Sequence, residues 1–303
     1  MTRRAALPVA LAGALALATG TALAGDRAAG DPAAGNTGAE PASAGCGAPP
    51  ALMVIGPAQA RVAARIGRGE ALTIVAVGSS STQGSGASAP GLSYPSRLEA
   101  ELKNRFPAIG IRVINRGKGG EDVTEELARL DREMIAERPD LVIWQVGTNA
   151  VLRRDDLAAD RELIERGVAQ LKQSGSDVVL MDLQYAPRVI ARPAYAEMEQ
   201  LIANAAKRGR VGLFRRFEMM QKWQAAQPAD APRTAEAMIG PDGLHMTDRG
   251  YFCLAANLAD ALAGNWWSQG RAAQRAAQHP PAARVAGLAG SGAVAAVPFG
   301  AAP

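Results

Sequence analysis

The residues most suited to chemistry in this chain are a histidine, an aspartate and a group of serines. Of the two histidines among 303 residues, His279 lies in an Ala/Pro-rich stretch, whereas His245 follows Asp242 by three positions. A carboxylate so placed can orient the imidazole, which then takes the proton of a hydroxyl nucleophile. The segment Gly78-Ser79-Ser80-Ser81 supplies such hydroxyls. These residue types together indicate acyl transfer through a serine, with His245 as the base.

Acyl transfer also needs N–H donors for the oxyanion that forms at the carbonyl carbon. The glycine-rich turn over residues 117–120 can supply a backbone N–H, from Gly120 or from Gly119. Asn149 can supply its side-chain NH2. Each of these residues also has a structural interpretation, because serines commonly cap helices, and glycines and asparagines commonly form turns.

Five short apolar runs predict the strands that position these residues. They cover residues 72–77, 111–114, 141–146, 177–183 and 211–214. Near-continuous apolar runs are typical of strands buried on both faces of a parallel sheet. The serines follow the first run, the glycine turn follows the second and Asn149 follows the third. Because ligands bind beyond the carboxyl ends of such strands, we expect these residues to meet at one edge of the sheet.

Apolar residues at helical spacing predict helices between the strands. The stripes are Val123, Leu127, Leu130 and Met134, then Leu157, Ile164, Val168 and Leu171, and finally Leu254, Leu258 and Leu262. Each stripe is wide enough to cover one face of a sheet. Strands alternating with helices through right-handed crossovers predict a three-layer α/β/α sandwich.

Four segments, in order along the chain, resemble the sequence blocks of the SGNH (GDSL-type) serine hydrolases. Gly78-Ser79-Ser80 resembles the first block, residues 115–121 the second, Gly147-Thr148-Asn149 the third and Asp242-Gly-Leu-His245 the fifth, all within residues 72–263. The resemblance implies that Ser80 is the nucleophile and that Asp242 and His245 are catalytic. It also implies an oxyanion hole formed by Ser80, Gly120 and Asn149, and no metal or organic cofactor.

Two residues depart from the pattern of that family. Ser79 stands where an aspartate usually precedes the nucleophile, and Ala150 stands where an aspartate often follows the asparagine. The catalytic side chains themselves are all present, so we expect activity. Both changes lie beside the site, where they can alter its polarity, its orientation or its substrate.

The first 24 residues predict a secretory signal peptide. Arg3 and Arg4 precede an uncharged apolar stretch over residues 5–18, and Ala22-Leu23-Ala24 offers a cleavage site with small residues. An uncleaved anchor is the alternative, but the stretch is short for a membrane span. We therefore expect an exported protein, in the periplasm or outside the cell, with no integral membrane segment after cleavage.

Alanine, glycine and proline dominate both ends of the chain. Residues 25–50 predict a flexible linker and residues 268–303 a disordered tail, because neither segment has enough large apolar side chains to offset the entropy of ordering. The hydrolase domain then covers residues 51–267. The net charge of +4 falls to +2 without Arg3 and Arg4, which gives no reason to expect nucleic acid as a partner.

Cys46 and Cys253 are the two cysteines. In an exported protein they can form a disulfide, which would tie the start of the folded region to the last helix. Two free thiols are one alternative. Lipidation of Cys46 is another, disfavoured because charged residues separate it from the apolar stretch.

Together these observations predict a flavodoxin-like fold of about five parallel strands that carries an esterase site. The expected reaction is hydrolysis of short-chain or O-acetyl carboxylic esters through an acyl-enzyme on Ser80. The substrate would be a small-molecule, polysaccharide or lipid ester. One alternative is an O-acyltransferase that uses the same residues on envelope polysaccharide. Another is a non-catalytic carbohydrate-binding accessory protein on the same scaffold. The oligomeric state is left open.

Overall fold

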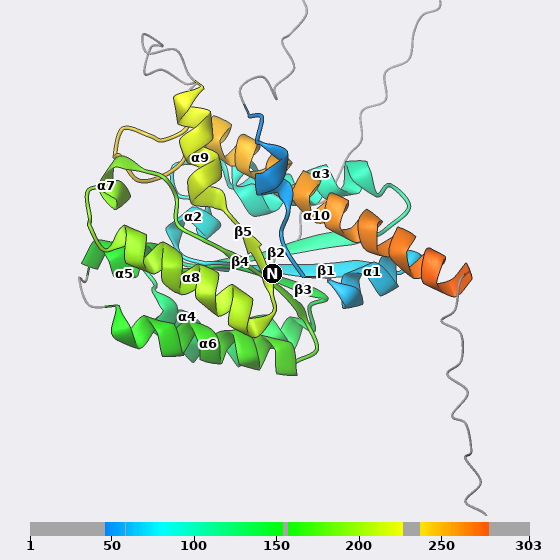
Figure 1. The fold of residues 1–303 in the computed structure, drawn as a ribbon. Coiled ribbons are helices and arrows are strands. Elements are labelled where there is room, and N and C mark those ends of the chain that lie inside the picture. Colours follow the sequence, from blue (N-terminus) through cyan, green and yellow to red (C-terminus); the bar gives the residue numbers. More distant parts are fainter. Residues whose placement is uncertain (1–45, 58, 154–156, 227–236, 279–303) are drawn as a thin grey trace, which may run out of the picture. The chain divides into compact units, whose positions relative to one another are not determined.

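The five predicted apolar runs form one sheet in which every strand is parallel to its neighbours. Figure 1 shows the computed structural model, which describes residues 46–57, 59–153, 157–226 and 237–278. The strand order β2-β1-β3-β4-β5 is that of flavodoxin-like folds, so the predicted fold class is confirmed. The strands are β1 (Leu72–Gly78), β2 (Ile111–Gly117), β3 (Leu141–Gln145), β4 (Asp177–Met181) and β5 (Gly212–Phe214).

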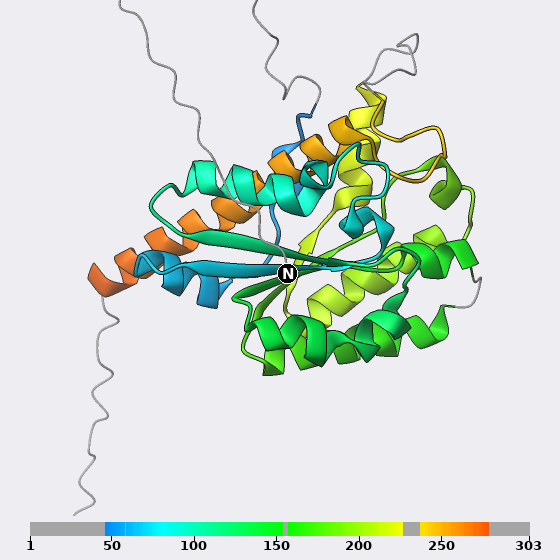
Figure 2. The ribbon, with the colours of Figure 1, turned by 180° about the vertical axis from the view of Figure 1, so that it is seen from behind.

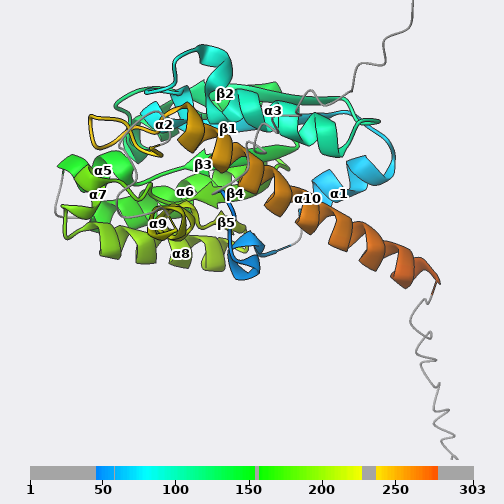
Figure 3. The same ribbon diagram turned by 90° about the horizontal axis from the view of Figure 1, so that it is seen from above.

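Helices cover both faces of this sheet and complete the three layers (Figures 1 and 2). One face carries α1 (Ala60–Gly67), α3 (Tyr94–Arg105), α9 (Arg216–Ala225) and α10 (Asp248–Gln278). The other carries α4 (Val123–Ala128), α6 (Ala158–Gln173) and α8 (Tyr195–Gly209). Figure 3 shows the long helix α10 crossing beside α3 and α1. The short helices are α2 (Ser80–Gln83), α5 (Thr148–Arg153) and α7 (Pro187–Ile190), with 3-10 turns η1 (Pro50–Met53) and η2 (Pro90–Leu92).

The interior strand β1 shows why the strand sequences are continuously apolar. Leu72, Ile74 and Ala76 pack into the core beneath α3 and α10, whereas Val75 and Val77 pack into the core beneath α6 and α8. All five side chains are at most 1% exposed. Since successive side chains point to opposite faces, a strand covered on both sides must be apolar at every position.

The predicted helical stripe from Val123 to Met134 is not one α-helix. α4 begins with a capping box, in which Asp122 accepts a hydrogen bond from the N–H of Thr124 at 3.0 Å and Glu125 accepts one from the N–H of Asp122 at 2.9 Å. After Ala128 the chain continues as a π-helical turn, η3 (Leu130–Met134), and a 3-10 turn, η4 (Ile135–Glu137). At this break the buried guanidinium of Arg129 donates to a carbonyl oxygen of β2 at 2.8 Å.

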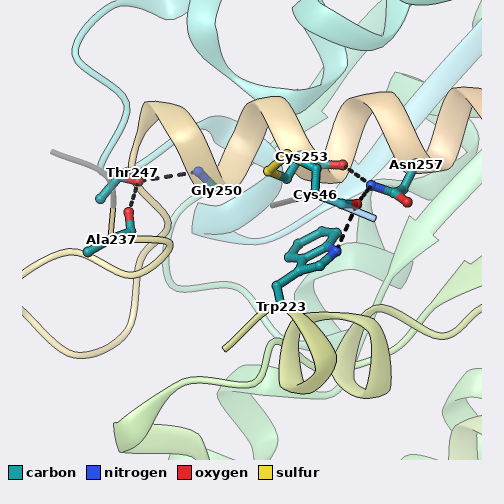
Figure 4. Close-up of a disulfide and its surroundings, with 7 residues drawn as sticks. All are labelled: Cys46, Trp223, Ala237, Thr247, Gly250, Cys253 and Asn257. Atoms are coloured by element: carbon teal, nitrogen blue, oxygen red, sulfur yellow. Dashed lines mark hydrogen bonds between the residues drawn. A yellow bond between two sulfur atoms is a disulfide. The ribbon is translucent and has the colours of Figure 1, made fainter. Parts of the chain in front are cut away.

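The start of the folded part lies earlier than predicted. Residues 46–50, expected in the linker, are described, and Cys46 is 4% exposed. A disulfide joins Cys46 to Cys253 of α10, with the two Cα atoms 5.1 Å apart. The carbonyl oxygen of Cys46 accepts hydrogen bonds from the Trp223 indole at 3.1 Å and the Asn257 amide at 2.8 Å (Figure 4). This bond and these contacts order a segment whose composition predicted disorder.

The far end of the folded part also differs from the prediction. Helix α10 continues to Gln278, whereas a disordered tail was expected from residue 268. Residues 268–278 are rich in alanine, glutamine and arginine, which favour helix and extend α10 without a large apolar face. The predicted signal peptide (1–24), residues 25–45 of the linker and residues 279–303 lie outside the described residues. In the part of the chain that is described, no helix is long and apolar enough to cross a membrane.

Candidate active site

The predicted site residues meet at the carboxyl ends of β1, β2 and β3. Helix α2 follows β1, a loop over residues 118–122 follows β2, and α5 follows β3. Figure 1 shows α2 and α5 at the same end of the sheet. The loop over residues 240–247, which precedes α10, reaches the same edge, because the side chain of His245 contacts Ser80 there.

Ser80 is the one of three adjacent serines that faces the histidine. It is the first residue of α2, and its Oγ lies 2.9 Å from Nε2 of His245. Ser79 and Ser81 are buried, and their hydroxyls donate to Oε1 of Gln145 at 3.2 and 3.0 Å. The fold therefore separates the three hydroxyls that the sequence places side by side, two inward and one into the site.

Gln145, at the end of β3, holds the turn that precedes α2. Its Oε1 also accepts the backbone N–H of Ser79 at 3.1 Å. Gly78 makes this approach possible: its φ is +151°, and a Cβ there would lie 2.7 Å from Oε1 of Gln145. Sequence reasoning missed Gln145, although a polar residue that ends an otherwise apolar strand was an available signal.

The ring of His245 contacts the carboxylate of Asp242, the residue expected to orient it. Nδ1 of His245 lies 2.5 Å from Oδ2 of Asp242. The other carboxylate oxygen accepts the backbone N–H groups of Leu244 and His245, each at 3.0 Å. Partial burial acts to raise the pKa of Asp242, but the hydrogen bonds from Leu244 and from the ring and backbone of His245 outweigh it, so that its pKa lies below the usual range. A charged Asp242 can stabilise a positively charged imidazole.

The loop that carries Asp242 and His245 is fastened at several points. The N–H of Gly240 donates to the carbonyl oxygen of His245 at 2.8 Å, and the side-chain amide of Gln184 donates to the carbonyl oxygen of Leu244 at 3.3 Å. Gly86 has a φ of +91°, and a Cβ there would lie 2.4 Å from the carbonyl oxygen of Met246. The close approach of these two loops thus needs a glycine, and it sets the position of the histidine relative to Ser80.

The residues predicted as oxyanion donors follow β1, β2 and β3 at the edge of the sheet where Ser80 lies. In the described part of the chain, the backbone N–H groups of Ser80 and Gly120 have no hydrogen-bond partner. The N–H of Gly119, by contrast, donates to Oε1 of Gln83 at 2.7 Å. This contact favours Gly120 over Gly119 as the backbone donor. Asn149 directs one N–H of its amide to the carbonyl oxygen of Glu121 at 2.7 Å, which leaves its second N–H for a ligand.

The side chains of Gln83, Arg129 and Arg153 restrain the loop that contains Gly120. Arg153 of α5 donates to the carbonyl oxygen of Gly120. Arg129 forms an ion pair with Glu121 at 2.6 Å. A donor that is held in place before the reaction costs no reorganisation when charge develops on the substrate. Sequence reasoning did not single out these two arginines or Gln83, because no local pattern shows which distant backbone group a long polar side chain will reach.

The two departures from the family pattern have different surroundings. Ser79 is 3% exposed and takes part in the hydrogen bonds around Gln145. Ala150 is fully buried in the apolar core beneath α6 and α8. Among the described residues, no group of three or more His, Cys, Asp or Glu side chains is arranged to hold a metal ion.

Solved structures of similar fold include two esterases. A two-domain esterase active on acetylated mannans, co-crystallised with mannopentaose, superposes with a TM-score of 0.57 at 23% identity, over 70% of this chain and 55% of that one. An acetylxylan esterase from Geobacillus stearothermophilus superposes with a TM-score of 0.51 at 20% identity, over 64% and 95%. TesA superposes with a TM-score of 0.53 at 22% identity, over 64% and 99%. At these identities the likeness shows the fold.

Sequence comparisons identify a relative and a family to which the chain is similar. An acetylxylan esterase from Geobacillus stearothermophilus is 35% identical over 104 residues, which are 32% of this chain and about half (48%) of the relative. The profile of the non-GDSL lipase-like family matches residues 45–265, which is most of the chain and includes every residue of the site. The narrower resemblance to SGNH hydrolases stays a prediction. The chain, with its serine, histidine and aspartate at one edge of a flavodoxin-like sheet, belongs to the non-GDSL lipase-like family.

Proposed function

We propose that this protein is an exported serine esterase that hydrolyses carboxylic esters through an acyl-enzyme on Ser80. One observation carries the proposal: Ser80 Oγ lies 2.9 Å from His245 Nε2, and His245 Nδ1 lies 2.5 Å from Asp242 Oδ2. The backbone N–H of Ser80 has no hydrogen-bond partner among the described residues. A nucleophile, a base, an orienting carboxylate and an oxyanion hole are the full set that acyl transfer requires.

In the proposed reaction each residue has one role. Oγ of Ser80 attacks the ester carbonyl carbon while His245 takes its proton, and Asp242 stabilises the imidazolium that forms. The N–H groups of Ser80 and Gly120 and the free amide N–H of Asn149 bind the oxyanion. His245 then gives the proton to the departing alkoxide. Water repeats the sequence on the acyl-enzyme, with His245 as base again, and releases the carboxylic acid.

Acetyl esters of polysaccharides are the substrates that we favour. Two observations support this choice: the relative at 35% identity is an acetylxylan esterase, and a protein of similar fold is an esterase active on acetylated mannans.

Export is part of the proposal and is supported by two features. The first 24 residues have the charge, apolar stretch and cleavage site of a secretory signal. The disulfide between Cys46 and Cys253 is of the kind that persists in oxidising compartments. Signal cleavage and location can be tested together by N-terminal sequencing of the protein recovered from the cell envelope and from the medium.

A series of p-nitrophenyl esters from acetyl to octanoyl tests the activity. We expect hydrolysis to be fastest with acetyl, to be lost in Ser80→Ala, and to persist in Ser85→Ala, which removes a nearby hydroxyl outside the proposed triad. A fluorophosphonate should label the wild type and not Ser80→Ala. Full activity in Ser80→Ala would overturn the assignment, and preference for octanoyl would redirect the substrate to lipid.

An acyltransferase would use the same residues, with a sugar hydroxyl in place of water. The relatives named above are esterases, so hydrolysis is the proposal that they support. Mass spectrometry of an acetylated xylan digest distinguishes the two reactions. Free acetate indicates hydrolysis, and acetyl groups moved to an added oligosaccharide acceptor indicate transfer. An unlabelled, inactive wild type would instead favour the non-catalytic carbohydrate-binding interpretation.

A further inference from the structure

Arg216 is a fully buried arginine beneath the turn that carries Ser80. Its side chain is 0% exposed, and it is the first residue of α9. One terminal nitrogen donates to Oγ of Ser81 at 3.1 Å and the other to the carbonyl oxygen of Asp182 at 2.6 Å. Its Nε–H has no hydrogen-bond partner in the described part of the chain.

Stability alone gives a poor account of an arginine at this position. Burial of a guanidinium is costly, and an unpaired buried N–H adds to the cost. The N-terminus of a helix carries a partial positive charge, so a cation in the first turn of α9 is unfavourable there as well. Residues with such costs are commonly retained at functional sites, where their role offsets the loss of stability.

The contacts of Arg216 lead directly to both neighbours of the nucleophile. Ser81, which accepts from Arg216, donates to Oε1 of Gln145 at 3.0 Å, and the same oxygen accepts the N–H of Ser79 at 3.1 Å. Ser79 and Ser81, on either side of Ser80, thus both donate to Oε1 of Gln145. Arg216 supports this group through its hydrogen bond to Ser81. Ser80 itself makes no contact with Arg216 and stays free to react.

A carboxyl pair balances the charge of Arg216. Asp182, directly after β4, is 3% exposed and accepts the N–H of Phe217 at 2.9 Å, and its carboxyl interacts electrostatically with that of Glu199 from α8. Burial raises the pKa of both carboxyls, and the charge of Asp182 raises that of Glu199 further.

We propose that Arg216 is a positioning residue for the nucleophile, which acts through Ser81 and Gln145. The inference rests on the proposed function. By fixing the turn from below, Arg216 keeps Oγ of Ser80 within reach of His245 and keeps the Ser80 N–H directed toward the oxyanion. Substrate does not touch Arg216, so its loss should lower kcat and leave KM nearly unchanged.

Steady-state kinetics on an acetyl ester test this role with four variants. We expect Arg216→Met to lower kcat by about 10- to 100-fold, as a displaced nucleophile would, and Arg216→Lys to recover part of the loss. Ser81→Ala should lower kcat in the same direction, and the double variant Arg216→Met/Ser81→Ala should lose less than the product of the two single effects. Arg215→Met, which changes the adjacent and partly exposed arginine, is the matched control and should keep the wild-type kcat.

Circular dichroism and thermal unfolding of each variant show whether it is folded. If Arg216→Met does not fold, Ser81→Ala still decides the question, because it removes only one hydroxyl. Wild-type kcat in Ser81→Ala, or in a folded Arg216→Met, would overturn the positioning role while Ser80→Ala stayed inactive. Failure of the proposed function would look different, since the wild type itself would then hydrolyse no ester.

Discussion

Glu126 provides a test of how burial changes the pKa of a carboxyl near the loop over residues 118–122, which carries Gly120. It lies in α4, directly after the loop that carries Gly120, and is 1% exposed. Burial raises its pKa to about 8, against the opposing effects of a 2.7 Å hydrogen bond from the Trp144 indole and the charge of Arg129. At neutral pH the folded protein therefore holds Glu126 protonated, whereas the unfolded chain releases that proton.

The sign of the pH dependence follows from proton binding. Between the unfolded pKa of 4.5 and the folded value of about 8, the folded state binds more protons than the unfolded state, so stability falls as pH rises. Each unit of pKa difference corresponds to about 1.4 kcal/mol. The free energy of unfolding should therefore decrease by on the order of 3 kcal/mol between pH 5 and pH 8 because of this single group.

Glu126→Gln removes the titration and keeps an acceptor for the Trp144 indole. Urea unfolding at pH 5, 6, 7 and 8, followed by tryptophan fluorescence and circular dichroism, measures the difference. We expect the stability of the variant relative to the wild type to increase across this range by on the order of 3 kcal/mol. Glu126→Met should change the pH dependence of the free energy of unfolding in the same way, because it also removes the ionisable group. A wild-type pH dependence in both variants would refute the assignment of a protonated carboxyl.

Two further changes test the site and its anchor. Asn149→Ala should lower kcat on an acetyl ester about 100- to 1000-fold, because one oxyanion donor is lost, with KM changed far less; a kcat within twofold of the wild type would remove Asn149 from the oxyanion hole. Cys253→Ser opens a covalent loop that spans a sequence separation of 207. It should lower the free energy of unfolding by up to about 5 kcal/mol in chemical denaturation, and a stability equal to that of the oxidised wild type would contradict a structural role for the bond with Cys46.

The strands and the site edge could be predicted because their signals are local. A strand covered on both faces must be apolar at each position, so β1 is visible in the residues of 72–77 alone. The polar residues that follow the strands are then brought together by the topology of any parallel sheet. This is why Ser80, Asn149 and His245 could be proposed as neighbours although 165 residues separate Ser80 from His245.

The residues that fasten the site could not be predicted because their partners are distant. Gln83 reaches Gly119 across 36 residues, and Arg216 reaches Ser81 across 135. A long polar side chain has the same appearance in sequence whether it lies on the surface or satisfies a buried backbone group. The family resemblance indicated Gly120, and the Gln83 hydrogen bond, which occupies the N–H of Gly119, supports that choice.

The ends of the domain differ from the prediction for the same physical reason. Composition measures how much apolar surface a segment can bury, and residues 46–50 can bury little. A covalent bond from Cys46, with hydrogen bonds from Trp223 and Asn257 to its carbonyl oxygen, orders the segment by other means. At the other end, helix propensity extends α10 to Gln278 where no apolar stripe requires it.

The carboxyl groups around the site show how one fold assigns different protonation states. Asp242 is 45% exposed and accepts two backbone N–H groups and the imidazole, so donors outweigh burial and its pKa is lowered. Glu126 is buried with the indole N–H as its hydrogen-bond donor, so burial outweighs the donor and its pKa rises to about 8. Enzymes use such differences in environment to set the pKa of each carboxyl, and the pKa decides whether the group acts as an acid or as a charged carboxylate. Asp242 is therefore the carboxylate that can stabilise a protonated His245, whereas a protonated Glu126 adds no negative charge to α4, the helix that follows the loop carrying Gly120.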